Sequence, residues 1–230
     1  MKKIKETITR AYKKLIHLAF DEVTVLTADK IAKEIYVTFK KKNKKEYEDI
    51  AADAIEYALL YLWDMRDKYG DNEDFVFTKD VEKRVLEKLT PEKMVEKVIE
   101  EYNPVTGYLY ERESERKQAR LSEGMIAGKN NNDRDFYRKT IETNTNLWYT
   151  QSKQYAEDIA DTTVIEVWKE VGVKKIRWVT QGDEKVCSEC RPLDGKIFDI
   201  DKVPPKPHYR CRCLKVPVIV KEKVLTPKGE

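Results

Sequence analysis

Apolar residues recur every three or four positions through most of the chain up to Val171, a spacing that gathers them on one face of an α-helix. The pattern is strongest from Tyr47 to Tyr69, and Gly70 marks its end. Up to that glycine we predict three helices, over residues 4–19, from an N-cap at Thr27 to Phe39, and over residues 47–69. A lysine-rich run from Lys40 to Lys45 separates the second helix from the third in this prediction.

Two capping signals place the next helices. Thr78 begins a short segment with helical spacing, and Thr90-Pro91-Glu92 supplies a cap, a first-position proline and an early acid for another. The clearest break in the first half is Asn103-Pro104-Val105-Thr106-Gly107. We predict a domain boundary there.

The second half begins with a helix predicted from Tyr110 to Ala127 that is dense in charged residues. A helix this polar usually bridges solvent or lies against another charged surface. A loop from Gly128 to Asn132 follows, with Asp133 or Asp135 as the cap of the next helix. The last long helix is predicted to end at Gly172, where helices favour a left-handed residue.

In the C-terminal quarter the spacing of the apolar residues changes from every third or fourth position to every second position. Ile176, Trp178 and Thr180 alternate as in a strand. Asp194-Gly195 is a hairpin turn signal between two short apolar runs. Three prolines between residues 204 and 207 exclude helix and predict a surface connection between two strands.

These elements predict an α+β fold, with a mainly helical body followed by a small β-rich C-terminal module. The predicted organisation is a helical N-terminal region over residues 1–103, a domain over residues 104–220 with helices in 108–171 and a β module in 173–220, and a tail over residues 221–230.

All four cysteines and one of the two histidines lie close together near the C-terminus. They form two knuckles, Cys-x2-Cys and His-x2-Cys-x-Cys, made of Cys187, Cys190, His208, Cys211 and Cys213. Two thiolates separated by two residues can turn back on one metal ion from a tight loop. The second knuckle follows the first after a short connection, and the pair predicts a Cys/His site that staples the β module.

A tetrahedral zinc site needs four of these five side chains. We expect Cys187, Cys190, His208 and Cys211, with Cys213 as a close substitute, because residues 211 and 213 point to one face of an extended strand. The alternatives are one or two disulfides or free thiols. Nothing marks the protein as secreted, and cytosolic thiols stay reduced. Four protein ligands leave no position for water, so we expect structural zinc and no catalytic residue.

Two residues near the knuckles carry predictions of their own. Arg212 points away from the cysteines on either side of it, and we expect it to pair with Asp183 or Asp194 rather than to contact a phosphate or a partner. Trp178 is expected in the core rather than as a platform for stacking a base.

The composition is that of a folded, highly charged chain, with 38% charged and 10% aromatic residues. Residues 1–50 hold 13 basic and 8 acidic side chains, residues 51–170 hold 18 and 26, and residues 171–230 hold 14 and 8. Basic ends around an acidic middle can meet an acidic partner or nucleic acid, although solvated surfaces give the same pattern. No signal peptide and no run of ~20 apolar residues is present, so we expect a cytoplasmic protein without a membrane partner.

A series of motifs in the C-terminal segment carries a family resemblance. In order they are Gly172-Val173-Lys174-Lys175-Ile176-Arg177-Trp178-Val179, Asp183, Val186-Cys187-x2-Cys190, Leu193-Asp194-Gly195, Pro207-His208-x2-Cys211-Arg212-Cys213 and Pro217. Together with the charged stretch from Tyr108 to Arg120, they resemble the phage minor head proteins, the Mu F-like head morphogenesis family. The resemblance covers residues 104–218.

The resemblance implies a structural capsid protein, present in low copy in the virion and incorporated during head morphogenesis in the host cytoplasm. Such proteins commonly associate with the portal and affect DNA packaging or ejection. The implied partners are therefore the phage portal protein, other head proteins and, as a further candidate, packaged DNA. Some members carry a toxin domain after the zinc-like module, and with the sequence ending at Glu230 we expect none here.

Two other functions stay open on the residues. Treble-clef nucleases of the His-Asn-His type also combine Cys-x2-Cys with His and Asp, but they need a general-base histidine beside a metal ligand. If His208 binds zinc, only His17 in the first amphipathic segment remains. The other alternative is an independent zinc module that binds nucleic acid through the basic residues around the knuckles, with a steep salt dependence.

Overall fold

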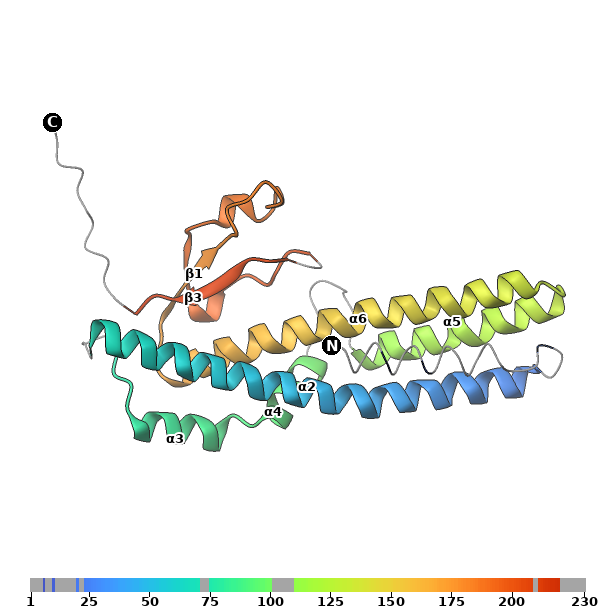
Figure 1. Cartoon of the computed structure of the whole chain (residues 1–230), viewed down its shortest axis with the longest axis horizontal. Helices are drawn as coiled ribbons and strands as arrows, with labels where there is room; N and C mark the ends of the chain where they lie inside the picture. The colour runs from blue at the N-terminus through green and yellow to red at the C-terminus, as the bar shows by residue number, and fades with distance from the viewer. Residues whose placement is uncertain are drawn as a thin grey trace. The chain divides into compact units, whose positions relative to one another are not determined.

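The computed structural model describes residues 6, 10, 20, 23–70, 75–100, 110–208 and 211–219. These residues are mostly helical, with a three-stranded antiparallel sheet near the C-terminus (Figure 1). The predicted α+β class is therefore confirmed. No described helix is both long enough and apolar enough to cross a membrane.

The chain forms two compact units, one of residues 1–52 and 91–160, the other of residues 53–90 and 161–230. The bounds of the units fall inside two long helices, so each of these helices contributes to both units. The domain boundary predicted at residue 104 lies outside the described residues and stays a prediction.

Helix α2 runs unbroken over Val25–Tyr69, where two helices separated at Lys40–Lys45 were predicted. The lysine run contains no glycine or proline, and lysine is a good helix former, so charge alone does not end the helix. The predicted cap at Thr27 is also wrong. Thr24 precedes the helix, and its Oγ1 accepts the Thr27 N–H at 3.2 Å while the Thr27 Oγ1 accepts the Thr24 N–H at 2.6 Å, a reciprocal pair like a capping box. Gly70 ends the helix with a φ of 70°, as predicted.

Helices α3 (Lys79–Lys88) and α4 (Pro91–Glu100) begin where predicted. The Thr78 Oγ1 caps α3 by accepting the Val81 N–H at 3.3 Å. The helix predicted over residues 4–19 and the break predicted at residues 103–107 lie outside the described residues, apart from Glu6 and Arg10, which are helical.

Helices α5 (Tyr110–Asn130) and α6 (Arg134–Glu170) are joined by a very short turn, and α5 lies beside the first part of α6 (Figure 1). The loop predicted from Gly128 to Asn132 is thus mostly helix. Gly128 is needed for the close packing of the pair, because a Cβ there would lie 2.9 Å from the Tyr137 Cβ and 3.1 Å from its backbone. Asp133 caps α6 by accepting the Phe136 N–H at 2.8 Å, one of the two predicted caps.

The first unit has its own apolar core, despite the charge of α5. The buried residues come from the chain before α2 and from α2, α5 and α6, and they are Phe20, Val23, Ala28, Ala32, Leu121, Met125, Tyr137 and Ile141. Lys117 also turns inward, because its ammonium contacts the Gln151 side chain and lies 5.7 Å from the Trp148 ring centroid. The exposed face of α5 includes Arg116 and Arg120 instead.

In the second unit, α6 ends in a Schellman motif. The Gly172 N–H donates to the Lys169 carbonyl and the Val173 N–H to the Trp168 carbonyl, both at 3.0 Å, and Gly172 has a φ of 90°. The predicted stop at Gly172 is confirmed. Trp168 in the last turn of α6 packs against Tyr61 of α2, with the two ring centroids 6.0 Å apart.

The sheet has the order β2-β1-β3, with β1 (Lys175–Val179) in the centre, β2 (Ile197–Asp199) and β3 (Leu214–Pro217). Both neighbours pair with β1 in the antiparallel sense. Ile176 and Trp178 are fully buried on one face, so the core position predicted for Trp178 is confirmed. Short 3-10 turns, η2 (Arg191–Leu193) and η3 (Ile200–Lys202), flank β2.

The turn predicted at Asp194-Gly195 forms, but it joins η2 to β2 rather than two strands. The Lys196 N–H donates to the Leu193 carbonyl at 3.0 Å, and Gly195 takes a φ of 71°. Asp194, with φ −56° and ψ 131°, makes this a type II turn, which needs glycine at its third position. The proline-rich segment forms the connection that leads to β3, as predicted.

Candidate metal centre

The sheet brings the two knuckles together. Cys187 and Cys190 follow β1, and His208, Cys211 and Cys213 precede β3. Because β3 pairs antiparallel with β1, the end of β1 lies beside the start of β3, with Val179 opposite Leu214. Three of the cysteines pack with the buried Trp178 in one cluster. All five predicted side chains therefore meet at one end of the sheet.

The distances between these side chains suit metal ligands. The Cys190 Sγ lies 3.6 Å from the His208 Nε2 and 3.5 Å from the Cys211 Sγ. Zinc bonds of about 2.3 Å to sulfur and about 2.0 Å to nitrogen give tetrahedral edges of about 3.5 Å between sulfur and nitrogen and about 3.8 Å between sulfurs. The Cys187 Sγ is closer to the His208 Nε2, at 2.9 Å.

Two groups of potential ligands share Cys190. In the first, the atoms of Cys187, Cys190 and His208 lie within 4.8 Å of one another, and in the second those of Cys190, Cys211 and Cys213 do. Cys211 and Cys213 are both buried, so burial does not distinguish which of the two would bind a metal. Which four side chains bind a metal stays a prediction.

Burial and hydrogen bonds shift the pKa values of the thiols in different directions. Burial raises the pKa of Cys190 and of Cys211. At Cys187 burial acts in the same direction, but hydrogen bonds from the Cys190 N–H, the Cys190 thiol and His208 outweigh it and lower the pKa to about 7. The Cys190 N–H donates to the Cys187 Sγ at 3.2 Å. A bound divalent cation would favour the thiolates of the buried pair as well.

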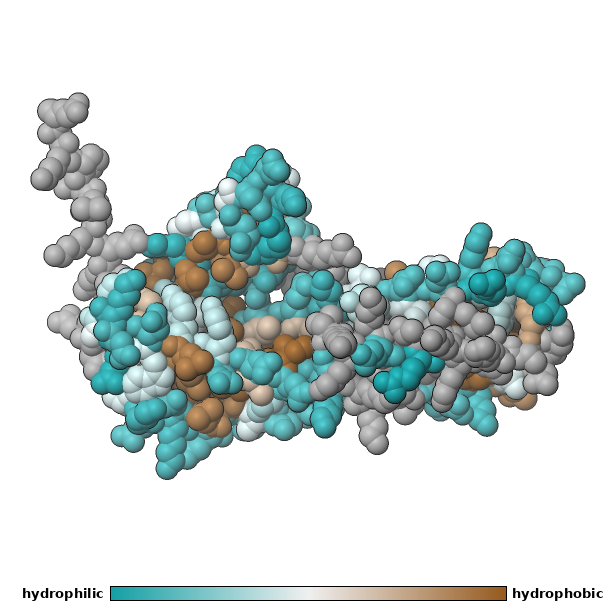
Figure 2. Space-filling model, viewed as in Figure 1, coloured by the Kyte–Doolittle hydropathy of each residue, from teal (hydrophilic) through white to brown (hydrophobic). Residues whose placement is uncertain are grey.

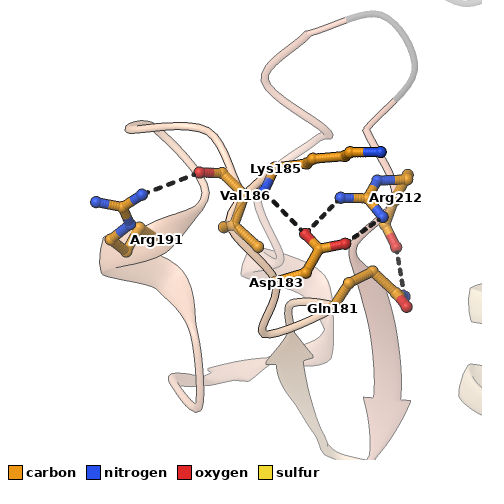
Figure 3. Close-up of polar contacts among 6 residues, drawn as sticks. All are labelled: Gln181, Asp183, Lys185, Val186, Arg191 and Arg212. Carbon is orange, nitrogen blue, oxygen red and sulfur yellow. Dashed lines mark hydrogen bonds and ion pairs between the residues drawn. The ribbon is translucent and has the colours of Figure 1, made fainter.

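An ion pair connects the loop before the first knuckle to the second knuckle (Figure 3). The Arg212 guanidinium donates to both carboxylate oxygens of Asp183, at 2.6 and 2.8 Å. Asp183 also accepts the Lys185 N–H at 3.1 Å, and Gln181 donates to the Arg212 carbonyl at 2.9 Å. The hydrogen bonds from Arg212 hold the pKa of Asp183 below its usual value. The pairing predicted for Arg212 is confirmed, with Asp183 as its partner.

Asp194, the other candidate partner of Arg212, has a separate role. Its Oδ1 accepts the Thr180 N–H at 2.8 Å, which ties the end of β1 to the turn before β2. This hydrogen bond lowers the pKa of the Asp194 carboxyl. Two aspartates therefore fix the loop that carries the first knuckle.

The sequence model of the family described as Phage Mu protein F like protein matches residues 79–216, more than half of the chain. The chain belongs to this family. The match runs from α3 to β3 and includes all five Cys/His side chains. Neither the comparison with curated proteins nor that with solved structures gave a significant match.

Membership makes the chain a phage head or head-morphogenesis protein of a structural family, found in the virion. The matched region begins upstream of the segment that first suggested the resemblance, and takes in α3 and α4. The Mu F-like region therefore includes parts of both compact units.

One ionic cluster of this Mu F-like protein was not predicted from its sequence. Asp161 on α6 lies 3.0 Å from the Lys206 Nζ and 3.8 Å from the Lys215 Nζ. The lysine side chains are only 12% and 9% exposed, and the Lys215 Nζ also lies 5.4 Å from the centroid of the Trp178 ring. The cluster fixes the β module on the end of α6. No local pattern could have revealed it, because both lysines lie far from Asp161 in the sequence.

The same geometry bears on the two alternative functions. His208 contacts two cysteines, and His17 lies outside the described residues, so the described part of the chain offers no second histidine as a base. Several basic residues proposed for nucleic acid are already paired, Arg212 with Asp183, Lys175 with Asp199, and Lys215 with Asp161.

Proposed function

We propose that the protein is a minor head protein of a bacteriophage, built into the head in low copy during assembly, in association with the portal, where it affects DNA packaging or ejection. The observation that carries the proposal is the family match over residues 79–216, together with a folded module in which all five predicted Cys/His side chains converge. Other head proteins are partners in this proposal, and packaged DNA is a further one.

The knuckles hold one structural zinc ion in this proposal. Four thiols and an imidazole form a soft donor set that suits zinc, and three of the cysteines are buried. Bound zinc would cross-link the loop after β1 to the segment before β3. The protein's own contribution is to hold the ligands in place through the Asp183–Arg212 pair and the bond from Thr180 to Asp194.

A structural and non-catalytic role follows from the same arrangement. His208 lies against Cys187 and Cys190 and serves as a ligand, so it is not available as a general base. The His208→Ala variant should lose metal or fold poorly, and wild-type protein with added divalent metal should not cleave DNA. Cleavage by well-folded protein that depends on His208 would support the nuclease instead.

The incorporation of the protein into heads is the direct test. Heads purified from infected cells should contain the protein at a copy number far below that of the major capsid protein. Heads assembled without the portal should lack it. Absence from normal heads, or the same amount in heads without a portal, would contradict the proposed role.

The exposed face of α5 supplies the portal-facing surface in this proposal, because it is charged and part of no described core. The test is charge reversal by Arg116→Glu and Arg120→Glu together, which should lower incorporation into heads and weaken portal binding in a salt-dependent way. Lys117 is left unchanged because it packs inside the unit. The matched control reverses Arg138 and Lys139, two exposed basic residues on α6, and should bind normally.

A further inference from the structure

The outer face of the small sheet carries four apolar residues beside three charged ones, Lys175, Arg177 and Asp199. Directly opposite residues of paired strands share one face, so Arg177 stands between Ile197 and Val216, and Val179 stands beside Leu214. Ile197 is 47% exposed and Leu214 is 52% exposed. The other face already carries the buried Trp178 and packs on the cysteines. An antiparallel sheet with one face in water normally has polar residues there.

The space-filling view agrees with this pattern. Figure 2 shows hydrophobic residues gathered over β3, whereas the loops that project beyond the sheet are hydrophilic. Arg177 lies in the centre of the outer face, and Lys175 lies at the end of β1 opposite Asp199, with which it forms an exposed ion pair of 3.4 Å. We call Lys175, Arg177, Val179, Ile197, Asp199, Leu214 and Val216 the sheet patch.

A second surface of the same unit has the complementary chemistry. On α2, Tyr57 is 57% exposed and Leu60 is 61% exposed. Exposed carboxylates surround them at helical spacing, and with the two apolar residues they form what we call the helix stripe, Asp53, Glu56, Tyr57, Leu60, Asp64 and Asp67. None of these four carboxylates forms an ion pair within the described part of the chain.

The two surfaces also match in size. Three strands spaced about 4.8 Å apart make a face about 10 Å wide, which is the width of one helix. From its first to its last residue β1 spans about 13 Å at about 3.3 Å per residue, and Glu56 to Asp64 of the stripe spans about 12 Å at about 1.5 Å per residue. Packing a helix on the open face of a sheet is a standard way to complete a layered core.

We propose that the sheet patch of one copy of this protein binds the helix stripe of α2 in a second copy. Both surfaces belong to the same compact unit and both are exposed in it, so the unit does not cover one with the other. Arg177 and Lys175, which also pairs with Asp199 of its own sheet, contact the carboxylates of the stripe, while Ile197 and Leu214 cover Tyr57 and Leu60. The contact is heterologous, so each copy uses one surface for each neighbour and the assembly is a ring or an open chain.

Sedimentation velocity of the full-length protein tests the proposal. The wild type should sediment as an oligomer whose size grows with concentration and falls with salt. Reversing the stripe by Asp53→Lys and Asp64→Lys, or the sheet patch by Lys175→Glu and Arg177→Glu, should each raise the dissociation constant at least about ten-fold, roughly 1.4 kcal/mol. A matched control reverses two exposed carboxylates of α3, Asp80→Lys and Glu87→Lys, and should assemble as the wild type does.

Charge-swap rescue makes the test specific. A one-to-one mixture of the stripe-reversed and patch-reversed proteins presents complementary surfaces at every contact and should assemble again. If a reversed protein does not fold, Leu60→Asp and Ile197→Asp at exposed positions replace it, and each should be monomeric. A wild type that is monomeric at every concentration, variants that assemble normally, or a mixture that does not recover would each overturn the proposal. The assay needs no phage heads, so its result is independent of the proposed portal role.

Discussion

Asp183 and Arg212 form a bidentate pair that joins the loop before the first knuckle to the centre of the second, although 29 positions separate them. Arg212 stands between two buried cysteines and points outward to reach the carboxylate. Both partners are partly exposed, so the pair acts by fixing geometry more than by adding stability. It holds the two loops in the positions from which their sulfur atoms converge.

We expect acid to weaken the Asp183–Arg212 pair and to loosen the loop that carries the first knuckle. The folded pKa of Asp183 lies below its unfolded value of about 3.9, so the contribution of the pair is fully present above about pH 5 and is lost as the pH falls through the folded pKa. The hydrogen-exchange protection factors of residues 180–191 should therefore fall in this acid range. Asp183→Asn should exchange faster at neutral pH and respond less to acid. Glu184→Gln, which removes the next carboxylate, is the control and should follow the wild type at every pH.

The metal content of single-cysteine variants can show whether Cys211 or Cys213 is the fourth ligand. If zinc is bound by Cys187, Cys190, His208 and Cys211, the wild type should hold about one equivalent by elemental analysis. Cys211→Ser should then lose it, and Cys213→Ser should keep it. Structural zinc can contribute about 10 kcal/mol or more to folding, so loss should also unfold the module. The reverse result would make Cys213 the ligand, and metal-free protein with intact disulfides by mass spectrometry would refute zinc binding.

Replacing Asp161 should destabilise the protein more than replacing an exposed carboxylate. Asp161→Ala removes the carboxylate that Lys206 and Lys215 contact at positions only 12% and 9% exposed, and should lower the free energy of unfolding by about 1–3 kcal/mol. Chemical denaturation measures the change. Asp201→Ala is the control, because Asp201 pairs with Lys169 but is 80% exposed, and it should cost under about 1 kcal/mol. Equal effects would show that the cluster on α6 is not the main attachment.

Gly128 should tolerate no side chain. A Cβ at this position meets the Tyr137 backbone at 3.1 Å, which cannot move aside as a side chain can. Gly128→Ala gains up to about 1 kcal/mol of helix propensity and loses about 1–3 kcal/mol to overpacking, so a net decrease in thermal stability is expected. Unchanged or higher stability would mean that α5 and α6 can separate at little cost.

Much of this protein could be predicted from its sequence because the physics involved is local. The cap at Thr78, the stop at Gly172 and the turn at Gly195 each depend on hydrogen bonds within a few residues, and their signals lie in the same few residues. The Cys/His spacing likewise predicts convergence, because a metal site limits how far its ligands can lie apart.

The predictions made from local sequence signals were wrong where tertiary packing determined the structure. The lysine run did not end α2 and Gly128 did not end α5, because neither feature breaks the helical hydrogen bonds and close packing selects glycine at position 128. Contacts between distant residues depend on how elements pack. Only the tertiary structure could therefore choose Asp183 over Asp194 for Arg212, bring Lys206 and Lys215 to Asp161, and leave Ile197 and Leu214 exposed on the outer face of the sheet.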